Sequence, residues 1–137
     1  MSNHDLPRDL QESRADADAG RQPLTLDALR DALRVFAGER EWGIFHSPKN
    51  LAMALSAEAG ELIEVFQWLT EDESRHLEPA ALDAARDELA DVLLYLVRLA
   101  DTLDVDLIDA ARRKLAANAV KYPVDKARGS RRKYDEL

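Results

Sequence analysis

One apolar stripe with helical spacing runs through the longest regular segment of this sequence. The stripe consists of Leu82, Ala85, Leu89, Val92, Leu96, Leu99 and Leu103. Intervals of three and four residues place these side chains on one face of an α-helix, whereas a strand with one buried face would show strict alternation. No segment of the chain sustains such alternation. The sequence therefore predicts an all-α fold.

Start and stop signals divide the chain into four long helices. Thr25, Ser47-Pro48 and Pro79 mark helix starts, because a hydroxyl caps the first turn and proline is favoured at its first position. The expected helices run from Thr25 to about Trp42-Gly43, from Pro48 to about Thr70, from Pro79 to Leu103, and from Leu107 to Lys121. Because the residue before a proline disfavours helical geometry, Tyr122-Pro123 closes the last helix. The pattern is typical of a four-helix bundle-like arrangement.

The first 23 residues lack this periodicity. They contain few large apolar side chains, so burial there could not offset the entropy lost on ordering. We expect a disordered leader over residues 1–23, an all-α domain over residues 24–123 and a basic tail over residues 124–137.

Composition excludes several classes of protein. The chain has no cysteine and a formal net charge of -8. The absence of cysteine rules out disulfides and thiolate metal sites, and we expect a cytoplasmic location. An acidic surface repels a phosphate backbone, so duplex nucleic acid is not an expected partner. The longest run of large apolar residues, Val92–Val97, is far shorter than the roughly 20 residues that cross a membrane.

Four carboxylates have the spacing of a metal site. On the second helix Glu58 falls between Leu55 and Leu62, inside the apolar stripe, and Glu61 lies at the edge of that stripe. An ionised carboxylate in an apolar face is costly unless it is paired or binds a metal. On the third helix Glu88 and Asp91 repeat the i, i+3 spacing, so side-by-side packing would bring all four together. Oxygen ligands without a helical histidine indicate Mg²⁺ or Mn²⁺.

Several ordered motifs surround these pairs and carry a resemblance to a known family. They are Phe45 to Leu51 (FHSPKNL), Glu58 to Leu62 (EAGEL), Phe66 to Trp68 (FQW), Asp87 to Leu96 (DELADVLLYL), and Ser130 to Tyr134 (SRRKY). In this order they resemble the MazG-like all-α nucleoside triphosphate pyrophosphohydrolases, and within them the dCTP-directed members. The resemblance covers about residues 25–137.

The resemblance implies an activity and a metal set. The family hydrolyses a nucleoside triphosphate to the monophosphate and pyrophosphate, which for the dCTP-directed members means dCTP to dCMP. By this resemblance Glu58, Glu61, Glu88 and Asp91 would hold Mg²⁺, and Glu61 would orient or deprotonate the attacking water. It also implies a homotetramer whose sites are built from more than one subunit.

Further positions match substrate contacts of the family. By resemblance Trp42, His46 and Trp68 would enclose the base, while Tyr95, Lys114, Asn118 and Tyr122 match positions for sugar and phosphate contacts. Lys121 lies on or near the helical face of Lys114 and Asn118, so it could meet the triphosphate with them. These residues also have a purely structural interpretation. The two tryptophans would be core residues at helix ends, and Lys121 would interact with the dipole at the end of its helix.

Two other functions stay open on the sequence. The chain has Thr102 where an arginine is expected in dCTP-directed vertebrate members, which leaves a broad-specificity nucleotide pyrophosphohydrolase as an alternative. A non-catalytic helical module that binds a metal-nucleotide complex would need the same acidic pairs.

Overall fold

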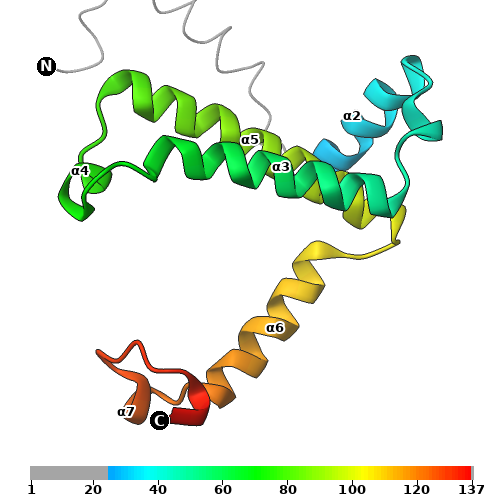
Figure 1. Cartoon of the computed structure of the whole chain (residues 1–137). Coiled ribbons are helices and arrows are strands. Elements are labelled where there is room, and N and C mark those ends of the chain that lie inside the picture. The colour runs from blue at the N-terminus through cyan, green and yellow to red at the C-terminus, as the bar shows by residue number, and fades with distance from the viewer. Residues whose placement is uncertain (1–24, 137) are drawn as a thin grey trace, which may run out of the picture.

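The computed structural model describes residues 25–136, and every regular element in that span is a helix (Figure 1). The elements are α2 (Leu26–Glu39), η1 (Trp42–Ile44), α3 (Pro48–Phe66), α4 (Glu71–Arg75), α5 (Pro79–Thr102), α6 (Leu107–Lys121), α7 (Val124–Ala127) and η2 (Tyr134–Glu136), where η denotes a 3-10 helix. The predicted all-α class is confirmed. The predicted leader, residues 1–23, lies outside the described residues.

Side-chain caps confirm the predicted helix starts at Thr25 and Ser47, and α5 begins at Pro79 as predicted. The Thr25 hydroxyl accepts from the Ala28 amide at 3.1 Å, and the Ser47 hydroxyl accepts from the Asn50 amide at 3.2 Å. The first helix ends earlier than predicted, at Glu39, because Glu41 adopts a left-handed conformation with φ of 54°. The chain then turns through η1, which puts Trp42 in a short 3-10 turn instead of at a helix end.

Two long antiparallel helices, α3 and α5, lie side by side and form most of the packing, with α2 against the later part of α5 (Figure 1). Their shared core is small. The buried apolar residues are Ala37, Leu51, Ala85, Val97 and Ala100. Leu51 is 1% exposed, and burying a leucine side chain stabilises a fold by about 2 kcal/mol. The small alanines allow close approach of the helices but contribute little apolar area of their own.

The fourth long helix does not join this packing. Figure 1 shows α6 leading away from the α3–α5 pair. It starts at Leu107, as the sequence predicts, and Asp106 caps its first turn after Asp104 turns the chain with φ of 54°. Its apolar side chains Ile108, Leu115 and Val120 are 62%, 72% and 82% exposed. The four predicted helices are therefore present, but within one chain only three of them pack together.

Short helices also form outside the four predicted ones, between Thr70 and Pro79 and in the basic tail. A capping box starts α4: the Thr70 hydroxyl accepts from the Glu73 amide, and the Glu73 carboxylate accepts from the Thr70 amide at 2.8 Å. The tail forms α7 and η2 and returns to the end of α6, where Tyr134 meets Tyr122 edge-to-face. Within residues 25–136, no helix is both long enough and apolar enough to cross a bilayer.

Candidate metal and nucleotide site

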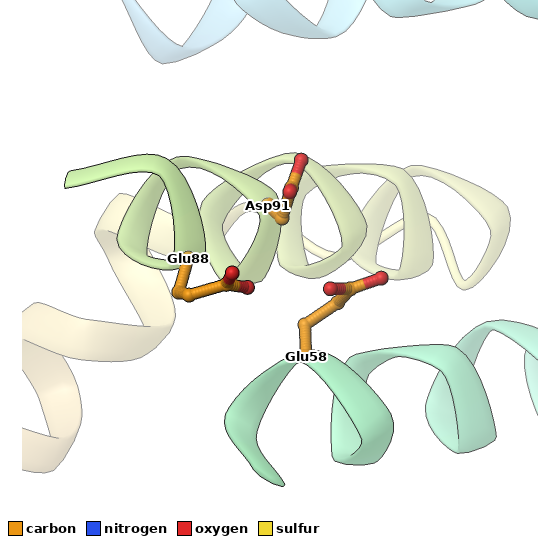
Figure 2. Close-up of side chains that lie close together, drawn as sticks. All are labelled: Glu58, Glu88 and Asp91. Carbon is orange, nitrogen blue, oxygen red and sulfur yellow. The ribbon is translucent and has the colours of Figure 1, made fainter. Parts of the chain in front are cut away.

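Three of the four predicted acids meet between α3 and α5. One carboxylate oxygen from each of Glu58, Glu88 and Asp91 lies within 4.8 Å of the others. Figure 2 shows Glu58 rising from α3 toward α5, on which Glu88 and Asp91 lie close to it. The i, i+3 spacing along α5 keeps its two acids on one side of the helix. The structure thus brings together three of the four predicted metal ligands.

The acidic cluster is electrostatically unbalanced. Burial raises the pKa of Glu58, and the charges of Glu61 and Asp91 raise it further. Burial likewise raises the pKa of Glu88, followed by the charges of Glu61 and Glu58. One oxygen of Glu88, Oε2, is buried without a hydrogen-bond partner. Since a buried polar atom normally has a hydrogen-bond partner, the unpartnered oxygen of Glu88 and its acidic neighbours are suited to bind a cation.

The donor set also fits the type of cation. All three oxygens come from carboxylates, which suit Mg²⁺ and Mn²⁺, whereas zinc prefers nitrogen and sulfur ligands. Two of the three side chains, Glu58 and Glu88, are half-buried, and Asp91 is exposed. An ion held here would therefore keep an open side for water or a phosphate oxygen.

Glu61 lies beside the cluster without being part of it. It is exposed, and its charge raises the pKa of both Glu58 and Glu88. A carboxylate that interacts electrostatically with the cluster and is exposed to solvent is suited to hold a water molecule near a metal. Its catalytic role stays a prediction.

An aromatic cavity of about 220 Å³ opens beside the acids. It is lined by Leu33, Phe36, Ala37, Trp42, His46, Asp91, Leu94, Tyr95 and Arg98. Trp42 sits between two rings, edge-to-face with Phe36 at 5.7 Å and with His46 at 6.0 Å between centroids. Because drug-sized ligands occupy pockets of about 300–1,000 Å³, this cavity suits one ring system and not a whole nucleotide. Asp91 belongs to both the cavity and the acidic cluster.

Other predicted substrate residues lie elsewhere in the single chain. His46 precedes α3 and Trp68 follows it, so at about 1.5 Å per residue the helix separates them by roughly 28 Å. Trp68 is 87% exposed. Four of the predicted residues lie along or just after α6, which leads away from the α3–α5 pair (Figure 1): Lys114, Asn118, Lys121 and Tyr122. One chain therefore brings Trp42, His46 and Tyr95 together, but not the other five.

The lysine at the end of α6 has a local partner. The Lys121 ammonium lies over the Tyr134 ring, 5.0 Å from its centroid. The tail motif is thus joined to the last turn of α6, next to Tyr122.

The sequence analysis assigned no role to a chain of polar contacts that starts at Arg98, one of the residues that line the cavity. The Arg98 Nε–H donates to Nδ1 of His46 at 3.1 Å, and a second Arg98 nitrogen donates to Asp101 at 3.0 Å. Asp101 also accepts from Arg34 Nε of α2 at 3.0 Å. Because Arg34 and His46 are far from α5 in sequence, no short-range motif signals these contacts. The i, i+3 spacing of Arg98 and Asp101 was the one available signal.

A second, larger cavity of about 580 Å³ lies between the start of α2 and the turn joining α5 to α6. Its arginines, Arg30 and Arg34, are each paired with aspartates. No residue of the metal-binding cluster and no aromatic ring lines this cavity. It is therefore not the candidate nucleotide site.

Known proteins are similar to this chain in sequence and in fold. Residues 53–137 match the MazG-like family. The chain is 46% identical over 115 residues to human dCTP pyrophosphatase 1, covering 82% of this chain and 68% of the human protein. Mouse dCTP pyrophosphatase 1 is 44% identical over the same shares. The crystal structure of a pyrophosphatase from Archaeoglobus fulgidus has a TM-score of 0.68 at 40% identity, over 72% of this chain and 92% of that one.

Proposed function

Because this chain belongs to the MazG-like family, we propose that it is a Mg²⁺-dependent nucleoside triphosphate pyrophosphohydrolase that converts dCTP, or a modified dCTP, to dCMP and pyrophosphate. One observation carries the proposal: Asp91 belongs both to the carboxylate cluster and to the aromatic cavity. A metal-bound phosphate and a stacked base would therefore occupy adjoining parts of one site.

Each acidic residue has a proposed task. Glu58, Glu88 and Asp91 would hold Mg²⁺, with Glu61 beside them. A bound Mg²⁺ would neutralise phosphate charge and stabilise the charge that develops as the bridge between the α and β phosphates is hydrolysed. Glu61 would accept a hydrogen bond, and then the proton, from the attacking water. Mn²⁺ suits the same oxygen ligands.

The base would enter the aromatic cavity. Trp42, His46 and Tyr95 line it, and an indole or imidazole face can stack on a pyrimidine. Stacking does not depend on base identity, so a preference for cytosine would come from hydrogen bonds to the base edge. For this reason a broad-specificity pyrophosphohydrolase is the second candidate function.

We also propose that the working site needs a second copy of this chain, in a homotetramer as the family resemblance implies. Large apolar side chains are exposed along α3, α5 and α6, among them Met53, Leu89 and Leu115 at 62%, 55% and 72%. Such a surface is typical of an interface. Association would cover α6 and could bring Trp68, Lys114, Asn118, Lys121 and Tyr122 of one subunit to the cavity of another.

The test is pyrophosphate release from a panel of the eight common nucleoside triphosphates plus 5-methyl-dCTP, with Mg²⁺ and with EDTA. Release confined to deoxycytidine substrates and abolished by EDTA supports the dCTP assignment. Equal release from purine and pyrimidine triphosphates favours the broad-specificity alternative. No release from any substrate would revive the non-catalytic module.

A further inference from the structure

The His46 ring accepts a hydrogen bond from Arg98, which lines the same cavity. The ring lines the aromatic cavity, and its Nδ1 lies 3.1 Å from Nε of Arg98 in a partly buried contact. Among the contacts of residues 25–136, no hydrogen bond reaches the other ring nitrogen, Nε2. The ring thus has one nitrogen occupied by the protein and one without a partner in the described part of the chain.

The chemistry of this contact fixes the tautomer. A guanidinium has five N–H donors and no acceptor, so Nδ1 must present its lone pair to Arg98. A neutral imidazole carries a single proton, which must then sit on Nε2. An imidazolium would place an N–H against an N–H. The contact therefore favours a neutral ring with Nε2–H as its remaining polar group.

We propose that Arg98 is a positioning residue that locks His46 in the Nε2–H tautomer, so that His46 offers a hydrogen-bond donor, and no acceptor, to the nucleotide base. This inference rests on the proposed function for the identity of the ligand. The group that His46 can recognise is an acceptor on the base edge, namely a ring nitrogen or a carbonyl oxygen. An exocyclic amino group, which only donates, finds no acceptor on this ring.

Arg98 is itself held in place. Its NH1 donates to Asp101 Oδ2 at 3.0 Å, and the two side chains are only 17% and 8% exposed. Asp101 is anchored on its other side by Arg34 of α2. Because guanidinium nitrogens form a rigid planar fork, fixing NH1 on Asp101 also fixes the direction of Nε–H toward His46. The chain Arg34–Asp101–Arg98–His46 ties the ring orientation to the packing of α2 on α5.

The electrostatic environment of His46 favours the same neutral form as the hydrogen bond from Arg98. Burial lowers the pKa of His46, and the positive charge of Arg98 lowers it further. Both effects favour the neutral ring, the only form that can accept from Arg98.

The tautomer can be read directly by ¹⁵N NMR of the full-length protein, at a pH above the ordinary histidine pKa of about 6.5. We expect Nδ1 of His46 to be unprotonated and Nε2 protonated, with His46→Gln identifying its signals. His76 is an internal comparison, because its Nδ1 faces the Asp72 carbonyl oxygen at 3.1 Å and must donate. A proton on Nδ1 of His46, or a doubly protonated ring, would overturn the proposal without any arginine variant.

Substitution of Arg98 tests the positioning role. Arg98→Met should give a mixture of His46 tautomers and raise the KM for dCTP about tenfold, with a smaller change in kcat. Arg98→Lys keeps a charged donor and should restore part of both effects. The matched control is Arg86→Met on the same helix, which removes an exposed pair with Asp83 and should change neither. An Arg98→Met protein with the wild-type tautomer and KM would overturn the proposal.

The two proposals fail in different ways. Suppose that the wild-type protein hydrolyses no nucleotide while His46 shows the Nε2–H tautomer. The proposed function and the role of His46 in base recognition are then wrong, but Arg98 still fixes the His46 tautomer. If dCTP is hydrolysed while His46 carries its proton on Nδ1, the proposed function stands and the role of Arg98 is wrong. The wild-type spectrum decides the tautomer even if Arg98→Met does not fold.

Discussion

Glu58 on α3 and Glu88 on α5 face each other with carboxylate oxygens within 4.8 Å, although both are acidic. Neither takes part in an ion pair among the described residues, and Oε2 of Glu88 is buried without a partner. Two half-buried acids in this relation destabilise the chain unless a cation lies between them. The site is therefore built at a cost to folding that metal binding would offset.

Mg²⁺ should stabilise the folded protein through this pair. A ligand that binds only the folded state, at about 100 times its dissociation constant, adds about 2.7 kcal/mol to the free energy of unfolding. We predict a higher Tm on adding Mg²⁺ to the EDTA-treated protein and a much smaller rise in Glu88→Gln. Glu64→Gln, an exposed acid on α3, is the matched control and should keep the full rise. Equal shifts in both variants would remove Glu88 from the metal site.

The metal-free protein should lose stability as pH rises. The pKa of Glu58 and that of Glu88 are raised in the folded chain, whereas in the unfolded chain both return to about 4.3. The folded state thus binds these protons more tightly, and this contribution to stability is lost as pH rises from 4.3 through the folded values. Urea unfolding in EDTA should show a shallower decline for Glu58→Gln than for wild type. Identical slopes for the two proteins would contradict this prediction.

Asp101 should have the opposite effect on the pH dependence of stability. The hydrogen bond from Arg34 holds the pKa of Asp101 below its usual range, helped by the charges of Arg34 and Arg98. A lowered folded pKa gives stability that is present above the unfolded value of about 3.9 and is lost as pH falls through the folded one.

The corresponding substitution is Asp101→Asn. It should cost about 2 kcal/mol at neutral pH, since it removes charged hydrogen bonds from a largely buried group, and the loss should shrink in acid. The comparison is Asp83→Asn, whose pair with Arg86 is exposed and should cost much less. An equal cost for the two variants at neutral pH would mean that the Asp101 contacts contribute little to folding.

A site shared between subunits predicts complementation. Glu58→Gln and Lys114→Ala should each lower the rate of dCTP hydrolysis at least about tenfold. In mixed oligomers, the intact acidic cluster of one subunit can meet the intact α6 of another. Unfolding and refolding the two variants together should therefore restore activity that neither has alone.

The control is a mixture of Glu58→Gln with Asp91→Asn, whose residues lie in one cluster of a single chain. No hybrid site in that mixture has a complete metal set, so activity should stay low. If both mixtures stay equally inactive, while light scattering shows oligomers in each, Lys114 does not act across the interface.

Local signals predicted most of the fold. Thr25 and Ser47 were predicted to begin helices because a short hydroxyl side chain can cap the first turn, and both do so. The capping-box spacing of Thr70 and Glu73 is also a local signal, and it accounts for α4, which the sequence analysis did not predict. Helix periodicity also brought Glu58, Glu88 and Asp91 together, because spacing within a helix fixes which side chains share a face.

Longer-range relations could not be predicted in this way. The sequence shows that α6 is amphipathic but not what covers it, so a four-helix bundle was the natural expectation for one chain. Trp42 and Trp68 are far apart because the whole length of α3 lies between them. The motifs alone do not show whether two such residues line the same pocket. The contact of Arg98 with His46 depends on how η1 is placed beside α5, which is a property of packing and has no short-range motif.

The central claim is tested most directly by identifying the products of dCTP turnover. ³¹P NMR of dCTP with the protein and Mg²⁺ should show dCMP and pyrophosphate forming in equal amounts, with no reaction in EDTA or with Glu88→Gln. Formation of dCDP and inorganic phosphate, or no turnover of dCTP by the Mg²⁺-loaded wild-type protein, would contradict the account.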